Sequence, residues 1–536
     1  MRHFEIPLTS ALAAAFVLAI VSGAAAQPAS AGPAFSEQLG QVNFPTSCAH
    51  QVQGAIEKGV ALLHSFQYQE SEQAFTDASE QDALCAISRW GQAMALDHQL
   101  WDFPSTETLA KGSAYIDQAQ KLDAKTGRER AYIAAAAAFY KDDPKLTHTA
   151  RVEAYSAAMA TLSRDNPQDS EAAAFYALSL VSLAYDDVDA LASRKKAIAI
   201  LEPLFAQQPD DPGFAHYLIH ATDTPELATQ GLAAARAYAK IAPDSSHAIH
   251  MPSHIFRRLG LWPDVIDSNL AAIAAAAAAT QAHRGDASYQ FHAMDFLDYA
   301  YLQSGQEAKA RQVVDGVKTV PGATGAQIVE HQSDFAVQNA IELHRWKEAA
   351  SLPIPDERLD LQDIVYWARA IGAARSGDLE GARADVQKLT ECIAARDARG
   401  KERGDRMPMG EAADQLEAEG WLAYAEVKSD DAVAKLRAAA DREDSDHSDP
   451  FSTPAREMLA DLLFELKRPA DAVKEYDAVL KDYPNRFDAL YGAARSAAAA
   501  ANPVLAQKFY IQLVAISLPG ADRPELQDAR SFAYKN

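Results

Sequence analysis

The sequence predicts an all-α protein, a right-handed α-solenoid of tandem helical hairpins. At 536 residues the chain is too long for one ordinary hydrophobic core, so a repeat array or several domains are expected. Hydrophobic residues make up 48% of the chain, and its alanine-rich segments with Leu, Lys, Glu and Gln favour helix. Runs of β-branched residues with a period of two, which would indicate strands, are hard to find.

The first 26 residues are predicted to be a secretory signal peptide. Arg2 precedes an apolar stretch from Leu8 to Val21, and the small residues Ala24–Ala26 come before Gln27. The alternative is an uncleaved membrane anchor, for which the apolar stretch is short. No later stretch is long and apolar enough to span a bilayer. We therefore expect a periplasmic or secreted protein, in which residues 27–44 form a flexible N-terminal segment.

Export would place the three cysteines in an oxidising compartment. There Cys48 and Cys85 could form a disulfide that ties the N-terminal segment to the next helix, and the sequence leaves open whether they do. Cys392 is then the odd cysteine, and we expect it to be a buried apolar residue.

The repeat unit is clearest between Pro454 and Pro484. Two antiparallel helices need small residues where they cross and large ones between, and the tetratricopeptide pattern of about 34 residues is built on this packing. The unit carries a large, two small and an aromatic residue at the expected places: Leu459, Ala460, Ala472 and Tyr476. Gly59, Phe75 and Ala78 mark an early repeat of the same kind. We expect roughly ten or more hairpins in the whole chain.

Two stretches interrupt the repeats and are predicted to be exposed loops. Residues 395–410 are charged and contain glycine, and residues 440–453 are acidic and polar. We take residues 395–410 as a linker between an N-terminal array, residues 45–394, and a C-terminal array, residues 411–536.

Five of the fifteen histidines are clustered in one short stretch of the chain: His216, His220, His247, His250 and His254. His216 and His220 are four residues apart, as are His250 and His254, so each pair shares one face of a helix. His250 follows His216 by one repeat length, and His254 follows His220 by the same distance. Because equivalent positions of consecutive repeats lie on neighbouring helices, we expect these four imidazoles to converge on one patch.

Four more side chains are candidates for the same groove. His247 is expected to face it. If about four residues are inserted into the preceding helix, His292 falls on the row of His220 and His254. Asp295 then lies one turn further along, and Asp223 is a similar candidate on the first helix.

The cluster has three competing interpretations. Neutral imidazole is a common metal ligand, so His216, His220, His250 and His254 could hold a transition metal ion. Zn, Cu, Fe and Ni all suit such ligands. The leading interpretation of the function is that the protein binds a protein, peptide or small ligand in the concave groove of the repeat array, where the histidines determine specificity. The metal-binding protein or metalloenzyme is the alternative, and a purely structural role of the histidines is the third interpretation.

Other features limit the function. The formal charge of −24 argues against a nucleic-acid partner. The sequence has no HExxH helix, GxSxG elbow, phosphate loop or CxxCH haem motif, so it assigns no reaction. His64 and His98 are also one repeat length apart, beside Trp90 and Trp101, and we expect aromatic packing rather than a site there.

Several stretches resemble a group of exported bacterial tetratricopeptide-repeat proteins, most of them uncharacterised: GVALLHSFQYQESEQAF, ISRWGQAMAL, AHYLIHATD, HAIHMPSHIFRRLG and FHAMDFLDYAYLQ. The resemblance covers about residues 45–350. It implies an α-solenoid and a periplasmic or secreted location. The repeat class in general implies binding of extended peptides or partner helices along the concave face. The resemblance implies no established reaction.

Overall fold

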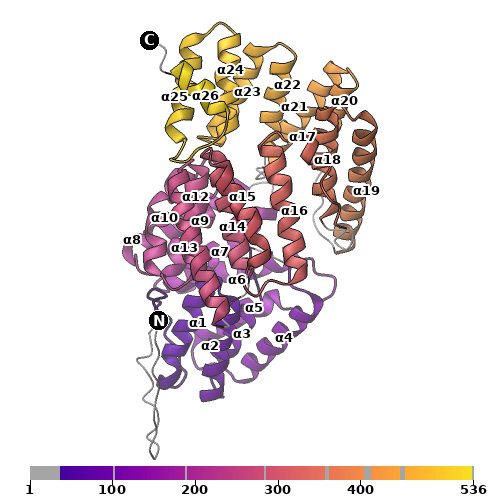
Figure 1. Cartoon of the computed structure of the whole chain (residues 1–536). Helices are drawn as coiled ribbons and strands as arrows, with labels where there is room; N and C mark the ends of the chain where they lie inside the picture. Colours follow the sequence, from indigo (N-terminus) through magenta and orange to yellow (C-terminus); the bar gives the residue numbers. More distant parts are fainter. Residues whose placement is uncertain are drawn as a thin grey trace, which may run out of the picture. The chain divides into compact units, whose positions relative to one another are not determined.

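In the computed structural model, every regular element of the described residues is helical (Figure 1). The structure describes residues 37–100, 103–186, 190–282, 285, 287–355, 361–403, 412–446 and 453–533. From Gln38 onward the chain forms one compact unit, to which everything below refers. The prediction of an all-α protein is confirmed.

The first half of the unit, in chain order, contains η1 (His50–Val52), α1 (Gln53–His64), α2 (Tyr68–Gln81), α3 (Ala86–Met94), α4 (Thr106–Lys121), α5 (Gly127–Phe139), α6 (His148–Asp165), α7 (Ser170–Asp186), α8 (Ala190–Gln207), α9 (Pro212–Thr222), α10 (Ala228–Ile241), α11 (Ser246–His250), α12 (Pro252–Arg258) and α13 (Trp262–Gln281). The second half contains α14 (Ser288–Gln303), α15 (Glu307–Gly316), η2 (Val317–Thr319), α16 (Gly325–Glu342), α17 (Trp346–Ala349), α18 (Gln362–Ser376), α19 (Leu379–Arg403), α20 (Ala413–Ala425), α21 (Ser429–Asp446), α22 (Ala455–Glu465), α23 (Pro469–Asp482), α24 (Phe487–Ala499), α25 (Pro503–Ile516) and α26 (Glu525–Ala533).

Consecutive helices pack against each other as hairpins. The spacing of the hairpins matches the predicted repeat: α9 and α11 begin at Pro212 and Ser246, one repeat length apart. Their partners α10 and α13 begin at Ala228 and Trp262, which are separated by the same length. The chain is therefore a stack of tandem helical hairpins, as the sequence predicts.

Small and aromatic residues fit together where the helices cross. Gly59 of α1 and Gly91 of α3 both lie against the ring of Phe75 on α2, so close that a Cβ on either glycine would overlap the ring. Gly492 of α24 stands in the same relation to Tyr476 of α23. These contacts let neighbouring helices approach closely, which is why the repeat pattern needs small residues there.

The residues that predicted the Pro454–Pro484 unit occupy its core. Leu459, Ala460, Ala472 and Tyr476 are completely buried. They come from α22 and α23, which pack together as one hairpin.

Two hydrophobic cores meet at α16. The first extends from Phe44 to Phe335 and the second from Val337 to Ala533. The change of core thus falls within a helix of the array, well before the linker expected at residues 395–410.

A buried ion-pair network joins helices of the two cores. Nη2 of Arg486 donates to Glu342 at 2.7 Å, and its Nε donates to Glu457 at 2.7 Å. Its Nη1 donates to the hydroxyl of Tyr299 on α14 at 2.9 Å. Arg486 and both glutamates are at most 1% exposed. Two carboxylates around one guanidinium compensate a charge that would otherwise be costly to bury.

Both predicted loops need correction. α19 continues to Arg403, so residues 395–403 are helical, and residues 404–410 lie outside the described residues. α21 continues to Asp446, so residues 440–446 are helical as well. Arg, Lys and Glu are good helix formers, and their abundance indicates an exposed face rather than a loop. The division into two arrays remains a prediction.

The described part of the expected flexible segment is packed, which corrects that prediction for residues 37–44. Phe44 is completely buried and stacks on Trp90, with ring centroids 5.4 Å apart. Leu39 is 6% exposed, and the backbone N–H of Gln41 donates to the carbonyl of Asp210 at 2.9 Å. Burial of two apolar side chains holds this segment against the helices.

The cysteine expectations are met in part. Cys48 and Cys85 form a disulfide, which joins the segment before α1 to the start of α3. Cys392 is half-buried on α19 rather than buried, because one side of that helix faces solvent.

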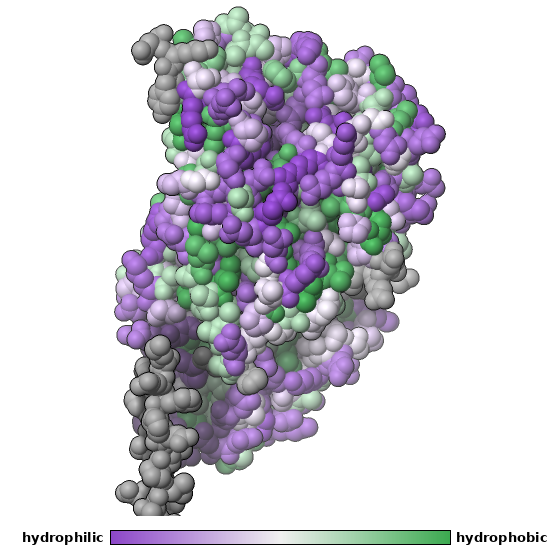
Figure 2. Space-filling model, viewed as in Figure 1, coloured by the Kyte–Doolittle hydropathy of each residue, from purple (hydrophilic) through white to green (hydrophobic). Residues whose placement is uncertain are grey.

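The face of the molecule that Figure 2 shows is predominantly polar. Figure 2 shows a face on which hydrophilic residues predominate and hydrophobic ones form scattered patches. Among the described residues, no helix is long and apolar enough to span a membrane. The predicted signal peptide, residues 1–26, lies outside the described residues.

Candidate metal centre

Four helices of consecutive hairpins bring six histidines together. α9 carries His216 and His220, and it begins at Pro212, where Asp211 caps the helix by accepting from the N–H of Gly213 at 2.9 Å. α12 packs against α9, and α11 contacts both α12 and α14. The labels of α9, α12 and α14 lie in the same part of Figure 1. The equivalent first helix of the next repeat is divided, since Pro252 begins a new helix after α11.

The first triad consists of His216, His220 and His247. Nε2 of His216 lies 3.1 Å from Nε2 of His220 and 3.1 Å from Nε2 of His247. The three side chains are 0%, 5% and 2% exposed, respectively. The ring of Phe66 covers them, with centroid distances of 4.4, 5.4 and 5.7 Å in the same order.

The second triad consists of His250, His254 and His292. Nε2 of His250 lies 3.2 Å from Nε2 of His254, and the rings of His250 and His292 have centroids 4.4 Å apart. One ligand atom from each of the three lies within 4.8 Å of the others. His250 is buried, His254 is partly buried and His292 is exposed. The second triad therefore reaches the surface.

The two triads adjoin each other. Ring centroids are 6.1 Å apart for His220 and His254, and again 6.1 Å apart for His247 and His250. The sequence predicted that His216, His220, His250 and His254 form one site, but the structure divides them between two triads. His247 completes the first triad and His292 the second, and both were predicted to face the groove.

Hydrogen bonds at Nδ1 determine the tautomers in the second triad. Nδ1 of His254 lies 2.9 Å from Oδ2 of Asp223, which can only accept when ionised. Nδ1 of His250 lies 2.6 Å from Oδ1 of Asn269. The amide nitrogen of Asn269 donates to the carbonyl of Val265 at 2.8 Å, so its oxygen is the atom that faces His250. Both Nδ1 atoms therefore carry hydrogen, so that in the neutral rings both Nε2 atoms present lone pairs to each other.

In the first triad, a hydrogen bond at Nδ1 determines the tautomer of one histidine, His216. Nδ1 of His216 donates to the backbone carbonyl of His64 at 2.5 Å, so its Nε2 also presents a lone pair. That single lone pair faces two nitrogens, those of His220 and His247, and it can accept a hydrogen bond from only one of them. Nδ1 of His220 is buried without a hydrogen-bond partner.

Burial favours the neutral form of the three rings of the first triad and of His250. It lowers the pKa of His216 to about 3, outweighing the hydrogen bond to the carbonyl of His64, which raises that pKa. Burial and neighbouring histidines likewise hold the pKa values of His220, His247 and His250 well below the ordinary 6.5. Since a neutral imidazole is the form that binds a metal, the nitrogens are available as ligands at neutral pH.

Asp223 supports the second triad from outside it. Burial opposes its ionisation, but Arg258 and His254 outweigh this and keep its pKa well below the ordinary value. Nε of Arg258 donates to its Oδ1 at 2.8 Å, while its Oδ2 accepts from His254. Asp295 belongs to neither triad among the described residues.

His64 has a role that the sequence analysis did not foresee. The backbone carbonyl of His64 accepts from His216. On the ring of His64, Nδ1 lies 2.8 Å from the Tyr217 hydroxyl and Nε2 lies 2.7 Å from Oε2 of Glu171. Asp211 joins the buried group of His64 and Glu171. Burial lowers the pKa of His64 to about 4 and raises that of Glu171 to about 8. The only feature of the sequence that singled out His64 was its separation from His98 by one repeat length, and we interpreted that spacing as aromatic packing.

His98 does pack as expected. Its ring stacks on Tyr68 with centroids 4.3 Å apart. Trp90 is buried against Phe44 and Phe75, whereas Trp101 lies outside the described residues.

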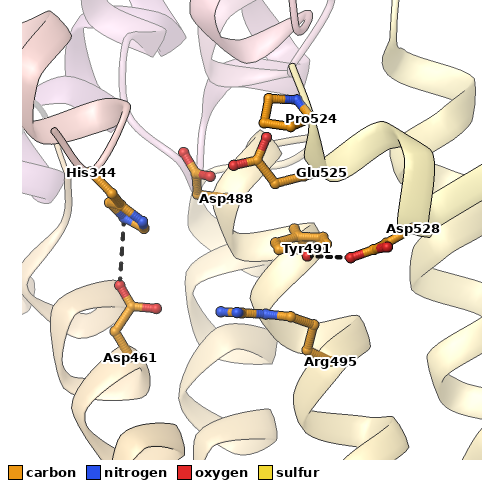
Figure 3. Close-up of a pocket in the computed structure, with 8 residues that line it drawn as sticks. All are labelled: His344, Asp461, Asp488, Tyr491, Arg495, Pro524, Glu525 and Asp528. Carbon is orange, nitrogen blue, oxygen red and sulfur yellow. Dashed lines mark hydrogen bonds and ion pairs between the residues drawn. The ribbon is translucent and has the colours of Figure 1, made fainter.

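A separate cavity of about 310 Å³ lies in the C-terminal hairpins (Figure 3). Its lining is rich in carboxylates: His344, Asp461, Asp488, Tyr491, Arg495, Pro524, Glu525 and Asp528. Figure 3 shows Asp461 near His344 and the Tyr491 hydroxyl directed at Asp528, at 3.8 and 3.0 Å respectively. Asp488 and Glu525 both pair with Arg523. Arg495 lies over the rings of Phe464 and Tyr491.

Comparison with known proteins shows only distant likenesses. No family model and no curated protein matches the sequence. Human IFIT1 bound to capped RNA is 13% identical, with a TM-score of 0.34 over 88% of this chain and 91% of that one. A tetratricopeptide repeat protein from Parabacteroides merdae is 11% identical, with a TM-score of 0.30 over 51% of this chain and 95% of that one. Yeast Tom70 is 12% identical, with a TM-score of 0.27 over 90% of this chain and 95% of that one. At these scores the likenesses carry no argument about what the chain binds.

Proposed function

We propose that this protein binds transition metal ions through its two histidine triads. The observation that carries the proposal is the pair of Nε2 atoms of His250 and His254, 3.2 Å apart with both Nδ1 atoms engaged elsewhere. Two lone pairs facing each other cannot form a hydrogen bond. A second proton on one of the rings would also resolve the conflict: burial disfavours the charged form of His250, whereas His254 is 15% exposed and lies beside the carboxylate of Asp223. A metal ion between the two nitrogens resolves it without that proton.

The distances suit a metal. Two imidazole nitrogens bound to one zinc ion at about 2.0–2.1 Å, at the tetrahedral angle, lie about 3.3–3.4 Å apart. The Nε2 separations of 3.1 and 3.2 Å in the triads are close to this value. Ligating histidines also usually donate their other N–H to a carbonyl or carboxylate, as His216 and His254 do. Zn, Cu, Fe and Ni all suit three imidazoles.

Elemental analysis of the protein, purified without an affinity metal, tests the proposal. The native protein should hold close to two transition metal ions per chain. His250→Gln and His216→Gln should each hold about one, because each removes a nitrogen from one triad only. His344→Gln, a change in the C-terminal cavity, should hold as much metal as the native protein. A metal-free native protein that also takes up no metal on titration would refute the proposal.

We infer that the protein works outside the cytoplasm. The predicted signal peptide supports this, and the Cys48–Cys85 disulfide fits an oxidising compartment. Cell fractionation tests it: the protein should appear in the periplasmic or secreted fraction, and a cytoplasmic protein with reduced cysteines would contradict the inference.

The cavity of Figure 3 favours a second candidate function, the binding of a ligand by the repeats themselves. The carboxylate of Asp528 accepts a hydrogen bond from the Tyr491 hydroxyl. The carboxylate of Asp461 accepts one from the Tyr476 hydroxyl and lies 3.8 Å from His344. None of these three contacts involves lysine or arginine. Four carboxylates line this hollow, against the basic side chains of Arg495 and His344, and an excess of carboxylates attracts a cation. We therefore propose a peptide, protein segment or small ligand that presents an amine or guanidinium group. The charge of −24 makes nucleic acid an unfavourable partner, as the sequence predicts.

Binding of short lysine-containing peptides tests this second function. Asp461→Asn with Asp528→Asn should weaken binding, and acetylation of the peptide lysines should do the same. Unchanged binding by the double variant would contradict the assignment of the cavity. Neither result bears on the triads, which lie on other helices.

A further inference from the structure

We propose that the two triads differ in function: an ion in the second triad keeps a coordination position open to water or a small anion, whereas the first triad encloses its ion. This inference rests on the proposed metal binding. It assigns the protein's exchangeable, chemically reactive position to His250, His254 and His292.

The first triad has no opening to solvent. None of its three histidines is more than 5% exposed. Phe66 covers all three rings, and Tyr238 stacks on His216 with centroids 5.0 Å apart. An ion here would be surrounded by imidazole and aromatic rings, which is the arrangement of a site that binds without exchanging ligands.

The second triad is covered on one side only. Phe296 packs against its members, with centroids 4.8 Å from His250, 4.6 Å from His254 and 5.3 Å from His292. His254 remains 15% exposed and His292 is exposed. Solvent can therefore approach this triad from the side of His292.

Three imidazoles leave one position of a tetrahedral shell unfilled. In the second triad Asp223 does not fill it, because both of its oxygens are engaged by His254 and Arg258. Three histidines with an open fourth position form the ligand set of water-activating metal sites. The fourth ligand must come from solvent or from a bound anion.

Positive charge next to the second triad favours an anion. The guanidinium of Arg257 lies over Phe296, 5.2 Å from the ring centroid, and over Tyr299 at 4.5 Å. Its positive charge helps to lower the pKa of His292, although burial is the main cause. Arg257 and Arg258 also line a small neighbouring cavity. A small anion bound to the ion would thus gain a second favourable interaction beyond the metal.

Cobalt and azide provide the test. The chelator-treated protein is loaded with Co²⁺, whose visible absorption reports its ligands, and azide is then added. We expect azide to change the spectrum of about half of the bound cobalt. His247→Gln, in the first triad, should keep this response, and His292→Gln, an exposed position that folding tolerates, should lose it. Arg257→Met should bind cobalt normally but azide more weakly, whereas Arg311→Met on the surface should match the native protein.

The possible failures are distinguishable. If no cobalt binds, the proposed function fails and this inference fails with it. If cobalt binds at both triads and azide changes nothing, only this inference is overturned. It is also overturned if the azide response persists in His292→Gln and disappears in His247→Gln.

Discussion

Nε2 of His250 and Nε2 of His254 face each other at 3.2 Å, although each ring already donates its hydrogen from Nδ1. In a protein interior, two such lone pairs repel unless a cation lies between them. The partners on the far sides, Asn269 and Asp223, hold the rings in this orientation. The fold therefore holds the two nitrogens face to face, and either a metal ion between them or a second proton on His254, beside Asp223, would relieve the repulsion.

Asp223 should control the affinity of the second triad. Asp223→Asn removes the negative charge that orients His254 and pairs with Arg258, so metal affinity there should fall about 10–100-fold. Competition with a chelator measures the metal affinity of each of the two triads. Asp264→Asn, which breaks a surface pair with Arg236, is the matched control and should leave both affinities unchanged. Equal loss in the two variants would contradict the role of Asp223.

Acid should destabilise the metal-free protein through His216. Its pKa is about 3 in the folded protein, because of burial, and about 6.5 when unfolded. Between these values only the unfolded chain binds the proton, so the free energy of unfolding falls as the pH falls, by about 1.4 kcal/mol per pH unit from this group. Urea unfolding from pH 7 to 4 should show a shallower loss in His216→Gln. Parallel pH profiles for the two proteins would show that His216 is not buried in a neutral form.

The Cys48–Cys85 disulfide should stabilise the protein substantially. It closes a loop with a sequence separation of 37 residues, and loop-closure entropy gives about 4 kcal/mol for such a loop. Replacing both cysteines with alanine should lower the free energy of unfolding by roughly this amount. Cys392→Ala, at a half-buried position without a disulfide, should have a much smaller effect. Denaturant unfolding with and without reductant compares them.

Arg486 should be essential for the junction of the two cores. Arg486→Met leaves Glu342 and Glu457 buried without their cation, which should cost about 3–5 kcal/mol of stability. Arg468→Met removes an exposed ion pair with Asp471 and should have a far smaller effect on stability, because solvent screens such a pair. Thermal unfolding distinguishes them, and similar losses would mean that the buried network contributes little.

Much of the fold follows from the spacing of residues in the sequence. Ala472 and Tyr476 mark a helix crossing because only a small residue next to a ring lets two helices approach so closely. Charge patterns were less informative. The segment up to Arg403 was expected to be a linker, yet it is helical, because composition reports solvent exposure and not the backbone conformation.

The spacing of the histidines in the sequence predicts that they lie close together, but not that they form two separate triads. A four-residue spacing places His216 beside His220, and the offset of one repeat brings the next pair near. Whether the ring nitrogens meet depends on side-chain rotamers and on the break before Pro252, neither of which periodicity contains. His64 contributes a backbone carbonyl, a group every residue has, so no sequence pattern could have shown it.

An anomalous difference map from crystals of the metal-loaded protein tests the central claim most directly. Data collected at the absorption edge of the bound metal should show two peaks, one about 2.0–2.1 Å from the Nε2 atoms of His216, His220 and His247, the other at this distance from those of His250, His254 and His292. A map without a peak at either triad, or with its metal bound elsewhere on the chain, would contradict the account.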